Sequence, residues 1–516
     1  MANLIDDIIR NAEQRPDAVA LRHGEDATTS YPDLRDACLA FAQRLRDRGV
    51  HPGDRVLLCC PSVDAYVVAY MGVQAAGGAI VAANTMATRD ELSYFLSDSG
   101  AKLAIGWHEN GPSLQEACDE TGTDLLVLTE YDAARPQSID AGALADLPID
   151  RADSDLAALL YTSGTTGKPK GTQLTVGGLS AAIDSAIVAS GMEAEDRCGT
   201  ALPLFHCFGQ VAGMLPTLRG GGSLTLLHPL TLEGQLAMIP ENGLTVMLGV
   251  PTMWMFLLYQ AGEEGVGAEH FSTLKYAVSG GAPLPESIIT RFEDELGVTV
   301  LEGYGLTETA AMGTFSQPGG PRKVGFVGSP VQGIELSVRD FDGRELGADE
   351  PGEVFLRGPQ ITAGYWNRPA DTDAAISKDG WFRTGDIGLR DADGDLRIVD
   401  RVKDMIIRGG YNVYPAEVES ILYQNPAVLE AAVIGVPDEK YGEEVATCVV
   451  IKPGEEVTPE DLEALCREHL SAYKVPRLIS FVDQLPKGAT GKTLKRGIDR
   501  AEVLKSAWRS ESALRK

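Results

Sequence analysis

Residues 161–171 read Tyr-Thr-Ser-Gly-Thr-Thr-Gly-Lys-Pro-Lys-Gly and follow an apolar run at 156–160. The run indicates a buried strand that leads into a loop. Three glycines permit tight, left-handed turns, and four hydroxyl side chains stand beside exposed backbone N–H groups, with two lysines adding positive charge. Together these residue types predict a loop that wraps a polyphosphate.

This loop differs from the common P-loop, in which four residues separate the first glycine from a Gly-Lys pair. Only two residues separate Gly164 from Gly167 here. Taken alone, a stretch rich in Gly, Ser and Thr is equally typical of a flexible polar surface loop. Motifs further along the chain favour the phosphate-binding interpretation.

Four such motifs follow in order. Residues 301–309 read Leu-Glu-Gly-Tyr-Gly-Leu-Thr-Glu-Thr and residues 381–388 read Trp-Phe-Arg-Thr-Gly-Asp-Ile-Gly. Residues 400–419 begin Asp-Arg-Val-Lys-Asp, and residues 486–495 read Pro-Lys-Gly-Ala-Thr-Gly-Lys-Thr-Leu-Lys. In this order and spacing, the set resembles the adenylate-forming (ANL) superfamily, which includes AMP-forming acyl-CoA synthetases, 4-coumarate-CoA ligases, peptide-synthetase adenylation domains and luciferases. The similarity covers almost the whole chain.

The chemistry of that superfamily explains such a residue set. A carboxylate is a poor electrophile because its charge is delocalised, so a thiol does not attack it directly. Transfer of AMP from ATP converts it to a mixed anhydride with a good leaving group. Because the carboxylate must approach an anionic α-phosphate in line, catalysis is mainly positioning and charge neutralisation.

The resemblance implies a nucleotide site with ATP as substrate. The β- and γ-phosphates would be held by the phosphate loop, namely Thr162, Ser163, Gly164, Thr165, Thr166, Gly167 and Lys168. Thr307 would contact the α-phosphate, and Glu308 would bind Mg²⁺, a hard cation suited to oxygen ligands. Asp386 and Arg401 would bind the ribose hydroxyls. Tyr304 would lie against adenine, and the other nucleotide-binding residues would be Gly281, Ala282 and Gly305.

The second half-reaction implied by the resemblance uses coenzyme A. A small C-terminal domain would rotate about a hinge at Lys403. In one orientation it would supply the catalytic Lys492, and in the other it would bring Gly409, Gly410 and Tyr411 beside a pantetheine tunnel. Glycines in that loop would let a narrow thiol arm pass close to the backbone. A lysine near a C-terminus is usually only solvated, but here the flanking motif favours a catalytic Lys492.

Substrate selection is less defined by the sequence. His206 matches an aromatic position near the carboxylate in acyl- and aryl-CoA ligases, although a packed core histidine is the ordinary alternative. The absence of Asp at this position argues against an α-amino acid. The resemblance places four small or apolar residues in the acid pocket, namely Phe205, Gly280, Ala311 and Met312. An apolar acid is therefore expected, and the choice between a fatty chain and an aryl ring stays open.

Composition restricts the possible partners and location. The formal charge of −29 and the lack of a long Lys/Arg block argue against nucleic-acid binding. Eight cysteines show no zinc-ligand spacing and are expected to be reduced. No signal-like N-terminus and no apolar stretch of membrane-spanning length are present, so we expect a soluble, cytoplasmic protein.

The pattern of elements predicts an α/β fold. Apolar runs at 56–60, 79–83, 103–105, 125–128, 224–227 and 276–278 alternate with helix-like segments at 63–76, 89–98, 178–190 and 286–295. That alternation predicts mostly parallel sheets covered by helices. After about residue 325, Asp-Gly turns indicate a small antiparallel β region. A small, mobile α+β domain follows, with helices at 415–423 and 459–470 and strands at 428–435 and 446–451. The predicted domains are residues 1–402 and 403–516.

Three functions remain open at this stage. The first is an AMP-forming acyl- or aryl-CoA ligase that acts on a small-molecule carboxylic acid. The second is a stand-alone adenylating enzyme with another acceptor, such as a carrier protein or an amine, or with an unusual substrate such as nitrite. The third, a non-catalytic ligand-binding relative, is disfavoured by the retained motifs. A homodimer is possible.

Overall fold

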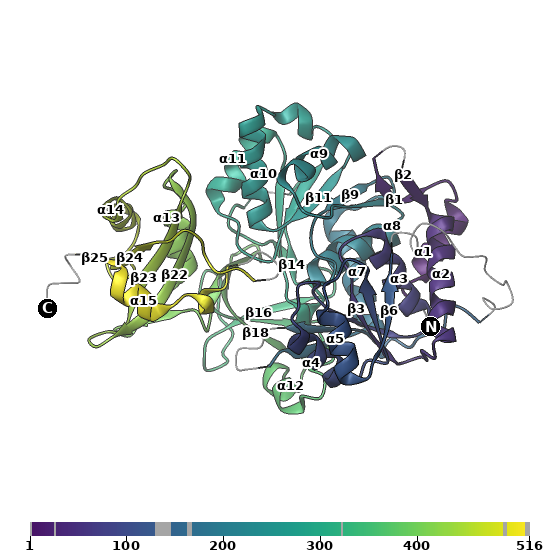
Figure 1. Cartoon of the computed structure of the whole chain (residues 1–516). Coiled ribbons are helices and arrows are strands. Elements are labelled where there is room, and N and C mark those ends of the chain that lie inside the picture. The colour runs from purple at the N-terminus through teal and green to yellow at the C-terminus, as the bar shows by residue number, and fades with distance from the viewer. Residues whose placement is uncertain are drawn as a thin grey trace.

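The computed structural model describes residues 3–24, 27–129, 146–162, 168–320, 323–488 and 493–510. Figure 1 shows a large body and, at one end, a smaller unit that contains α13, α14 and α15. Most of the large body is built from two sheets with helices between and outside them. The predicted α/β class, with mostly parallel sheets, a small antiparallel region and a small C-terminal α+β unit, is confirmed.

The larger sheet has nine strands within the described residues, and all pairs between β13 and β1 are parallel. Antiparallel strands extend it at both edges. Its order is β15 (Ser329–Pro330), β14 (Thr314–Phe315), β13 (Val300–Tyr304), β12 (Tyr276–Ser279), β11 (Val246–Gly249), β9 (Arg197–Thr200), β10 (Ser223–Leu226), β1 (Val19–His23) and β2 (Ala27–Ser30).

A second sheet of six strands is parallel except for its last pair, β7 with β8. Its order is β6 (Asp124–Leu128), β5 (Leu103–Trp107), β3 (Arg55–Cys59), β4 (Ala79–Ala82), β7 (Leu156–Thr162) and β8 (Lys170–Thr175). Residues on β3 alternate between two hydrophobic clusters: Val56 and Leu58 face the main core, whereas Leu57 and Cys59 face the opposite side. Both faces of this sheet are therefore covered, as a parallel sheet requires.

Helices fill three layers around these sheets. The main core joins one face of each sheet and includes α1 (Asp6–Gln14), α2 (Tyr31–Asp47), α3 (Asp64–Ala75), α7 (Val176–Ser190) and α8 (Leu215–Gly220). The outer face of the six-stranded sheet is covered by α4 (Arg89–Ser99) and α5 (Ser113–Thr121). The outer face of the nine-stranded sheet is covered by α9 (Leu232–Asn242), α10 (Pro251–Glu264) and α11 (Glu286–Leu296).

The predicted antiparallel β region is a four-stranded sheet. Its order is β16 (Glu335–Arg339), β17 (Gly352–Arg357), β18 (Phe382–Arg390) and β19 (Leu396–Arg401), and α12 (Pro369–Ala375) lies in the β17–β18 connection. The turns contain Gly343 and Gly394 with φ of 86° and 94°, so the Asp-Gly pairs supply left-handed backbone at these points.

The C-terminal unit has its own sheet and two hydrophobic clusters. Its strands are β20 (Ile406–Arg408), β21 (Tyr411–Val413), β22 (Val428–Asp438), β23 (Gly442–Ile451), β24 (Leu478–Phe481) and β25 (Trp508–Arg509). On one face lie α13 (Pro415–Leu422) and α14 (Pro459–His469), and on the other lies α15 (Arg500–Ser506). The chain passes from the four-stranded sheet to this unit between Arg401 and Ile406.

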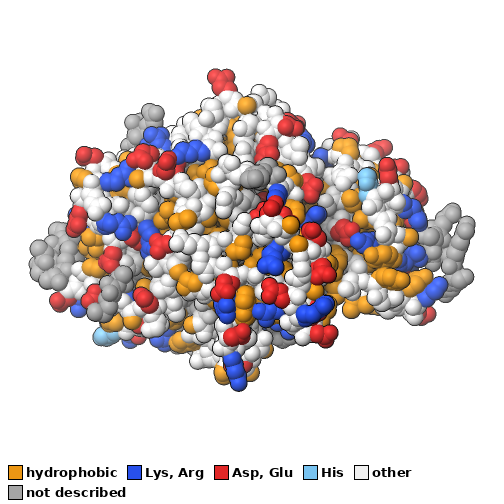
Figure 2. All heavy atoms as spheres, turned by 180° about the vertical axis from the view of Figure 1, so that it is seen from behind, with side chains coloured by type: hydrophobic (Ala, Val, Ile, Leu, Met, Phe, Trp, Pro, Cys, Tyr) orange, Lys and Arg blue, Asp and Glu red, His pale blue; other side chains and the backbone are white. Residues whose placement is uncertain are grey.

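Surface charge is mixed. On the face shown in Figure 2, Lys and Arg side chains are interspersed with Asp and Glu, so this face carries no broad basic surface.

None of the helices in the described part of the chain has the length and apolar composition needed to cross a bilayer. All eight cysteines are buried and unpaired.

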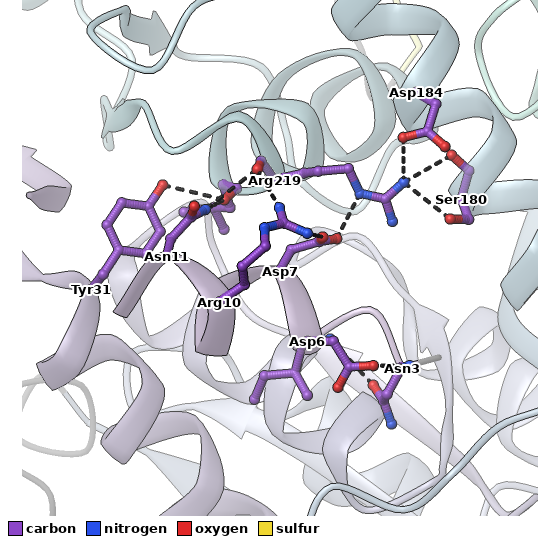
Figure 3. A network of polar contacts seen from close by, with 11 residues as sticks. Asn3, Asp6, Asp7, Arg10, Asn11, Tyr31, Ser180, Asp184 and Arg219 are labelled. Carbon is purple, nitrogen blue, oxygen red and sulfur yellow. Dashed lines mark hydrogen bonds and ion pairs between the residues drawn. The ribbon is translucent and has the colours of Figure 1, made fainter. Parts of the chain in front are cut away.

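An ionic network attaches the N-terminal helix to the main core (Figure 3). Asp7 of α1 accepts from Arg219 Nε at 2.6 Å, and Arg219 Nη1 reaches Asp184 of α7 at 2.8 Å. Both side chains of the Asp7–Arg219 pair are 13% exposed. Nearby, Asn11 and Tyr31 donate to the backbone carbonyl of Leu218. The contacts made by Asp7, Asn11 and Tyr31 join residues about two hundred positions apart in the sequence.

We predict that Arg219→Met lowers the midpoint of thermal unfolding by several degrees, because it leaves the mostly buried Asp7 carboxylate without its main partner. Loss of one partner of a buried ion pair costs about 3 kcal/mol. Arg10→Ala is the matched control, since Arg10 also pairs with Asp7 but is 45% exposed. Its effect is expected to be below about 1 kcal/mol. Equal shifts for the two variants in calorimetry would contradict this assignment.

Candidate active site

A single large cavity of about 1950 Å³ lies where the body meets the C-terminal unit. Its walls include residues that follow the carboxyl ends of β7, β9, β11, β12 and β13, together with β18, β19 and α13. In parallel α/β sheets, ligands bind at the carboxyl ends of the strands, where loops and helix N-termini converge. This cavity is therefore the candidate active site.

A tight turn presents Thr307 and Glu308 to the cavity. Gly305 has no room for a side chain, because an added Cβ would overlap the backbone carbonyl of Ala311. The turn closes through Ala310 and Ala311, whose φ angles of 47° and 65° are left-handed and cost non-glycine residues about 1–3 kcal/mol each. Strain of this size persists only where the surrounding structure enforces it, and it is concentrated at functional sites.

Glu308 is a buried carboxylate, 9% exposed, whose Oε1 accepts from the Tyr365 hydroxyl at 2.9 Å. Burial raises the pKa of Glu308, and the hydrogen bonds from its own backbone N–H and from Tyr365 oppose that shift. No group of three metal-ligating side chains occurs within the described residues. One carboxylate is nevertheless enough for Mg²⁺ when substrate phosphates and water supply the other oxygens.

A second polar cluster joins Tyr304, Asp386 and Arg401. The Tyr304 hydroxyl donates to Asp386 Oδ2 at 2.6 Å, and Arg401 Nε lies 3.4 Å from Asp386 Oδ1. Asp386 and Arg401 are paired across β18 and β19. Asp386 is only 5% exposed but lines the cavity, so its carboxylate is a fixed acceptor for hydroxyl groups. The sequence predicted that Tyr304 lies against adenine. In the structure its hydroxyl points toward the Asp386 carboxylate.

The phosphate loop connects two antiparallel strands, with Thr162 opposite Lys170 in register. A strand also follows the loop, whereas a helix would follow a P-loop, so the distinction drawn from the glycine spacing is confirmed. Thr162 and Lys170 line the cavity. Lys168 is exposed, does not line the cavity, and its ammonium lies 5.3 Å from the centre of the Tyr94 ring. Ser163, Gly164, Thr165, Thr166 and Gly167 lie outside the described residues.

The acid-pocket residues predicted from the sequence come together in the same cavity: Phe205, His206, Gly280, Ala311 and Met312. His206 precedes a π-helical turn, Phe208–Met214, of the kind frequently found at functional sites. Its Nδ1 accepts from the backbone N–H of Phe208 at 3.3 Å, which assigns the proton of a neutral ring to Nε2. A Cβ on Gly280 would lie 3.0 Å from the Phe208 ring.

Gly281 and Ala282, which follow β12, also line the cavity, and Gly281 has a left-handed φ of 82°. Lys403 lines it from the short connection to the C-terminal unit. The loop of Gly409, Gly410 and Tyr411 does not. That loop turns between β20 and β21, and Tyr411 is 61% exposed, with its ring centre 4.9 Å from that of Tyr473 and tilted by 30° to it.

Lys492 lies outside the described residues, but its surroundings are informative. Gly488 and Thr493, which bracket the segment, both line the cavity, and Lys487 pairs with Thr493 across a β-bridge. Lys495 also lines the cavity and forms an ion pair with Glu419 of α13 at 2.8 Å. The described ends of this loop therefore approach the cavity that contains Thr307 and Glu308.

Four residues at the site had no assigned role in the sequence analysis. Tyr365 donates to Glu308, and Asp371 pairs with Lys170 at 2.5 Å. The Cys207 thiol lies 3.5 Å from the Thr307 hydroxyl. Asp400 accepts from the backbone N–H groups of Arg401 and Ala416, both at 2.7 Å. Of these four, only Asp400 lies within a motif, and only tertiary contacts reveal the roles of the others.

Asp400 joins the body to the C-terminal unit. It is the last but one residue of β19, whereas Ala416 is the second residue of α13. Burial raises the pKa of Asp400 to about 6, while the nearby Lys495 charge and the two backbone N–H donors act in the opposite direction. The carboxylate also lies at a helix N-terminus, where negative charge is favoured.

Comparison with known proteins agrees with this geometry. Residues 8–366 match the family model for the AMP-binding enzyme, and residues 417–492 match its C-terminal domain. A two-unit fold with a nucleotide-type polar cluster at the junction defines the class as adenylate-forming enzymes. The chain belongs to the AMP-binding enzyme family, so the superfamily inferred from the motifs is confirmed.

Several relatives cover nearly the full chain. It is 36% identical to a feruloyl-CoA synthase from Amycolatopsis sp, over 94% of this chain and 96% of the relative. It is also 36% identical to a long-chain-fatty-acid–CoA ligase from Yersinia pestis, over 92% and 90%. The expected enzyme class, an AMP-forming acid–thiol ligase, is confirmed by these relatives and the family match.

Two solved structures of one similar protein, with and without ATP, match this chain to different degrees. The crystal structure of ATP-bound MatB from Rhodopseudomonas palustris matches with a TM-score of 0.86 at 31% identity, covering 96% of this chain and 98% of that one. The apo structure of the same protein matches with a TM-score of 0.78 over the same shares. The arrangement of this chain is therefore nearer to that of the ATP-bound form.

We predict a pH-dependent effect of Asp400→Asn on thermal stability. The pKa of Asp400 is about 6 in the folded protein against 3.8 for an ordinary Asp, so the folded state keeps a proton that the unfolded chain releases. This group's contribution to stability therefore falls as pH rises from about 4 to about 6, and stays constant above that. Asn has no such titration.

The difference in unfolding midpoint, Asp400→Asn minus wild type, should thus increase across that interval and then level off. Differential scanning fluorimetry in buffers of equal ionic strength measures it. A difference that is flat, or that decreases with pH, would contradict the assignment.

Proposed function

We propose that this protein adenylates an apolar carboxylic acid with ATP and then transfers the acyl group to coenzyme A. One observation carries the proposal: a single cavity contains both the polar cluster of Asp386, Arg401 and Tyr304 and a wall of apolar residues around His206. A nucleotide and an apolar acid can therefore meet in one cavity, as an in-line attack on the α-phosphate requires.

In this proposal Asp386 and Arg401 bind the ribose, and Thr307 contacts the α-phosphate. Lys170, which lines the cavity, neutralises the outer phosphates, and Lys168 joins it by leaving the Tyr94 ring. Bound Mg²⁺ would be held by Glu308 and would reduce the negative charge on the phosphates. His206 lies beside the acid carboxylate, and the backbone N–H of Phe208 donates to its Nδ1, which orients the ring.

Domain rotation is part of the same proposal. We place the boundary at residues 402/403 and the hinge at Lys403, within the connection between β19 and β20. The contacts that hold the present arrangement include the Asp400 bond to Ala416, which bridges this connection. Rotation would break that bond and bring Gly409, Gly410 and Tyr411 to the cavity, whereas the opposite orientation would supply Lys492 for adenylation.

Coenzyme A is the acceptor favoured by the two relatives named as CoA ligases or synthases, both of which match over nine tenths of this chain. A carrier protein, an amine or an unusual substrate such as nitrite are the competing possibilities, and the acceptor test below distinguishes them. A homodimer and a cytoplasmic location stay expectations from the sequence.

We predict that the purified enzyme releases pyrophosphate and AMP from ATP only when a suitable apolar acid is present, and forms an acyl-CoA when coenzyme A is added. Pyrophosphate release is followed by a coupled assay, and the nucleotide and thioester by mass spectrometry. Formation of ADP and orthophosphate would contradict adenylation. Pyrophosphate release without a thioester would indicate another acceptor, and no release with any acid would favour a binding protein.

We predict that Lys492→Ala abolishes adenylation, with a loss of at least about a hundredfold, while thioester formation from supplied acyl-adenylate continues. The ammonium is expected to neutralise charge that develops only in the first half-reaction. Lys505→Ala is the control, because Lys505 is highly exposed and pairs with Glu502 on α15. Equal losses in both half-reactions would contradict the role of Lys492.

A further inference from the structure

Part of the cavity lining comes from the inner face of the nine-stranded sheet, and we call this part of the cavity the branch. Val246 and Leu248 of β11 line it, and so does Val250 just after the strand. These residues alternate, so their side chains lie on one face. Val278 of β12 lines the same branch and is in register with Leu248.

Helix α7 and the π-helical turn form the opposite wall. Ala186 and Ser190 of α7, four residues apart and hence on one helix face, line the cavity, as do Ala212 and Met192. Tyr276, which is in register with Val246, donates its hydroxyl to the carbonyl of Ser190 at 2.8 Å. This hydrogen bond ties the sheet to the last turn of α7 at the inner end of the branch.

The depth of the branch distinguishes a chain from a ring. Val246 and Val250 are four residues apart, which corresponds to about 13 Å of extended backbone. An extended polypeptide covers about 3.3–3.6 Å with three backbone bonds, so an extended carbon chain spanning the same depth has about eleven bonds. A single aromatic ring next to its carboxyl group would fill only the outer part.

The polarity of the residues that line the branch also favours an aliphatic chain over a hydroxylated ring. Of the inner lining residues, Ala186, Met192, Ala212, Val246 and Leu248 are apolar, and Ser190 donates its hydroxyl to the Ala186 carbonyl of its own helix at 2.7 Å. Among these side chains only the Ser190 hydroxyl could accept a hydrogen bond from a phenol, so a phenolic hydroxyl placed beside the others would be buried unpaired, at a cost of about 1–3 kcal/mol. Methylene groups carry no such penalty and gain from burial.

We propose that this branch binds an unbranched aliphatic acyl chain of about ten carbons or more, and that Ser190 and Met192 set the maximum length. The inference deepens the proposed function and rests on it, because it requires that an acid is activated in this cavity. It selects a fatty acid over a hydroxylated aryl acid as the substrate.

The first test is a substrate series from butanoate to octadecanoate, with benzoate and 4-hydroxycinnamate beside it, measured by acid-dependent pyrophosphate release. We expect kcat/KM to rise by up to about fourfold per added methylene until the branch is filled. Both aromatic acids should be poorer substrates than decanoate. A higher kcat/KM for either aromatic acid, or an optimum at hexanoate or below, would overturn the proposal.

Two variants test the length limit in opposite directions. Ser190→Phe should shift the optimum to shorter acids, and Met192→Ala should shift it to longer ones. Val188→Phe is the matched control, because Val188 lies on the same helix but is exposed and does not line the cavity. Activity of each variant on butanoate shows that it is folded.

Failure of this inference is distinguishable from failure of the proposed function. If no acid supports pyrophosphate release, adenylation itself is refuted. If wild type releases pyrophosphate but neither Ser190→Phe nor Met192→Ala moves the preferred chain length, the acyl-chain branch is refuted while adenylation stands.

Discussion

Parallel strand pairing is the constraint on which the site depends. Because β9, β11, β12 and β13 run in the same direction, the segments that follow them all emerge at one side of the sheet. Thr162 at the end of β7, in the other sheet, lines the same cavity. The strained turn that ends at Ala311 is possible because this framework is covered on both faces by helices and does not yield.

Electrostatics inside the cavity differ from those of the chain as a whole. The protein carries a net charge of −29, yet several lysines line the cavity, each held by a carboxylate: Lys170 by Asp371, Lys487 by Glu430 and Lys495 by Glu419. An anionic substrate would compete with these carboxylates for the ammonium groups. Paired lysines keep a defined position, and the pairing limits non-specific capture of anions by an otherwise acidic protein.

At the junction between the two units, Asp400 accepts a backbone hydrogen bond from α13, and the pair of Lys495 with Glu419, both in the C-terminal unit, lies beside it. Polar contacts of this kind are suited to an interface that can open, because each can be exchanged for water at little net cost. The closer match to ATP-bound MatB than to its apo form agrees with an arrangement set for the nucleotide-binding step.

The sequence by itself determined the class of enzyme and many of the elements, and it predicted many of the residues that line the cavity. Helices such as α4 and α11 and strands such as β3 and β12 were predictable because their apolar spacing is local. The N-terminal strands were not, since β1 pairs with β10 about two hundred residues away. Tyr365 escaped detection for the same reason, because its contact with Glu308 has no local pattern.

Tertiary structure alone decided how these parts combine. The sequence could not choose between an aryl ring and a fatty chain, because the cavity is lined by residues from different segments, among them Val246, Ser190 and Met192. It could not show that the Tyr304 hydroxyl binds Asp386, since strand register places them together. The residues of a motif lie within a short stretch of sequence, so the sequence alone shows them. The shape of the cavity and the hydrogen-bond partners arise from packing between segments that are far apart in the sequence.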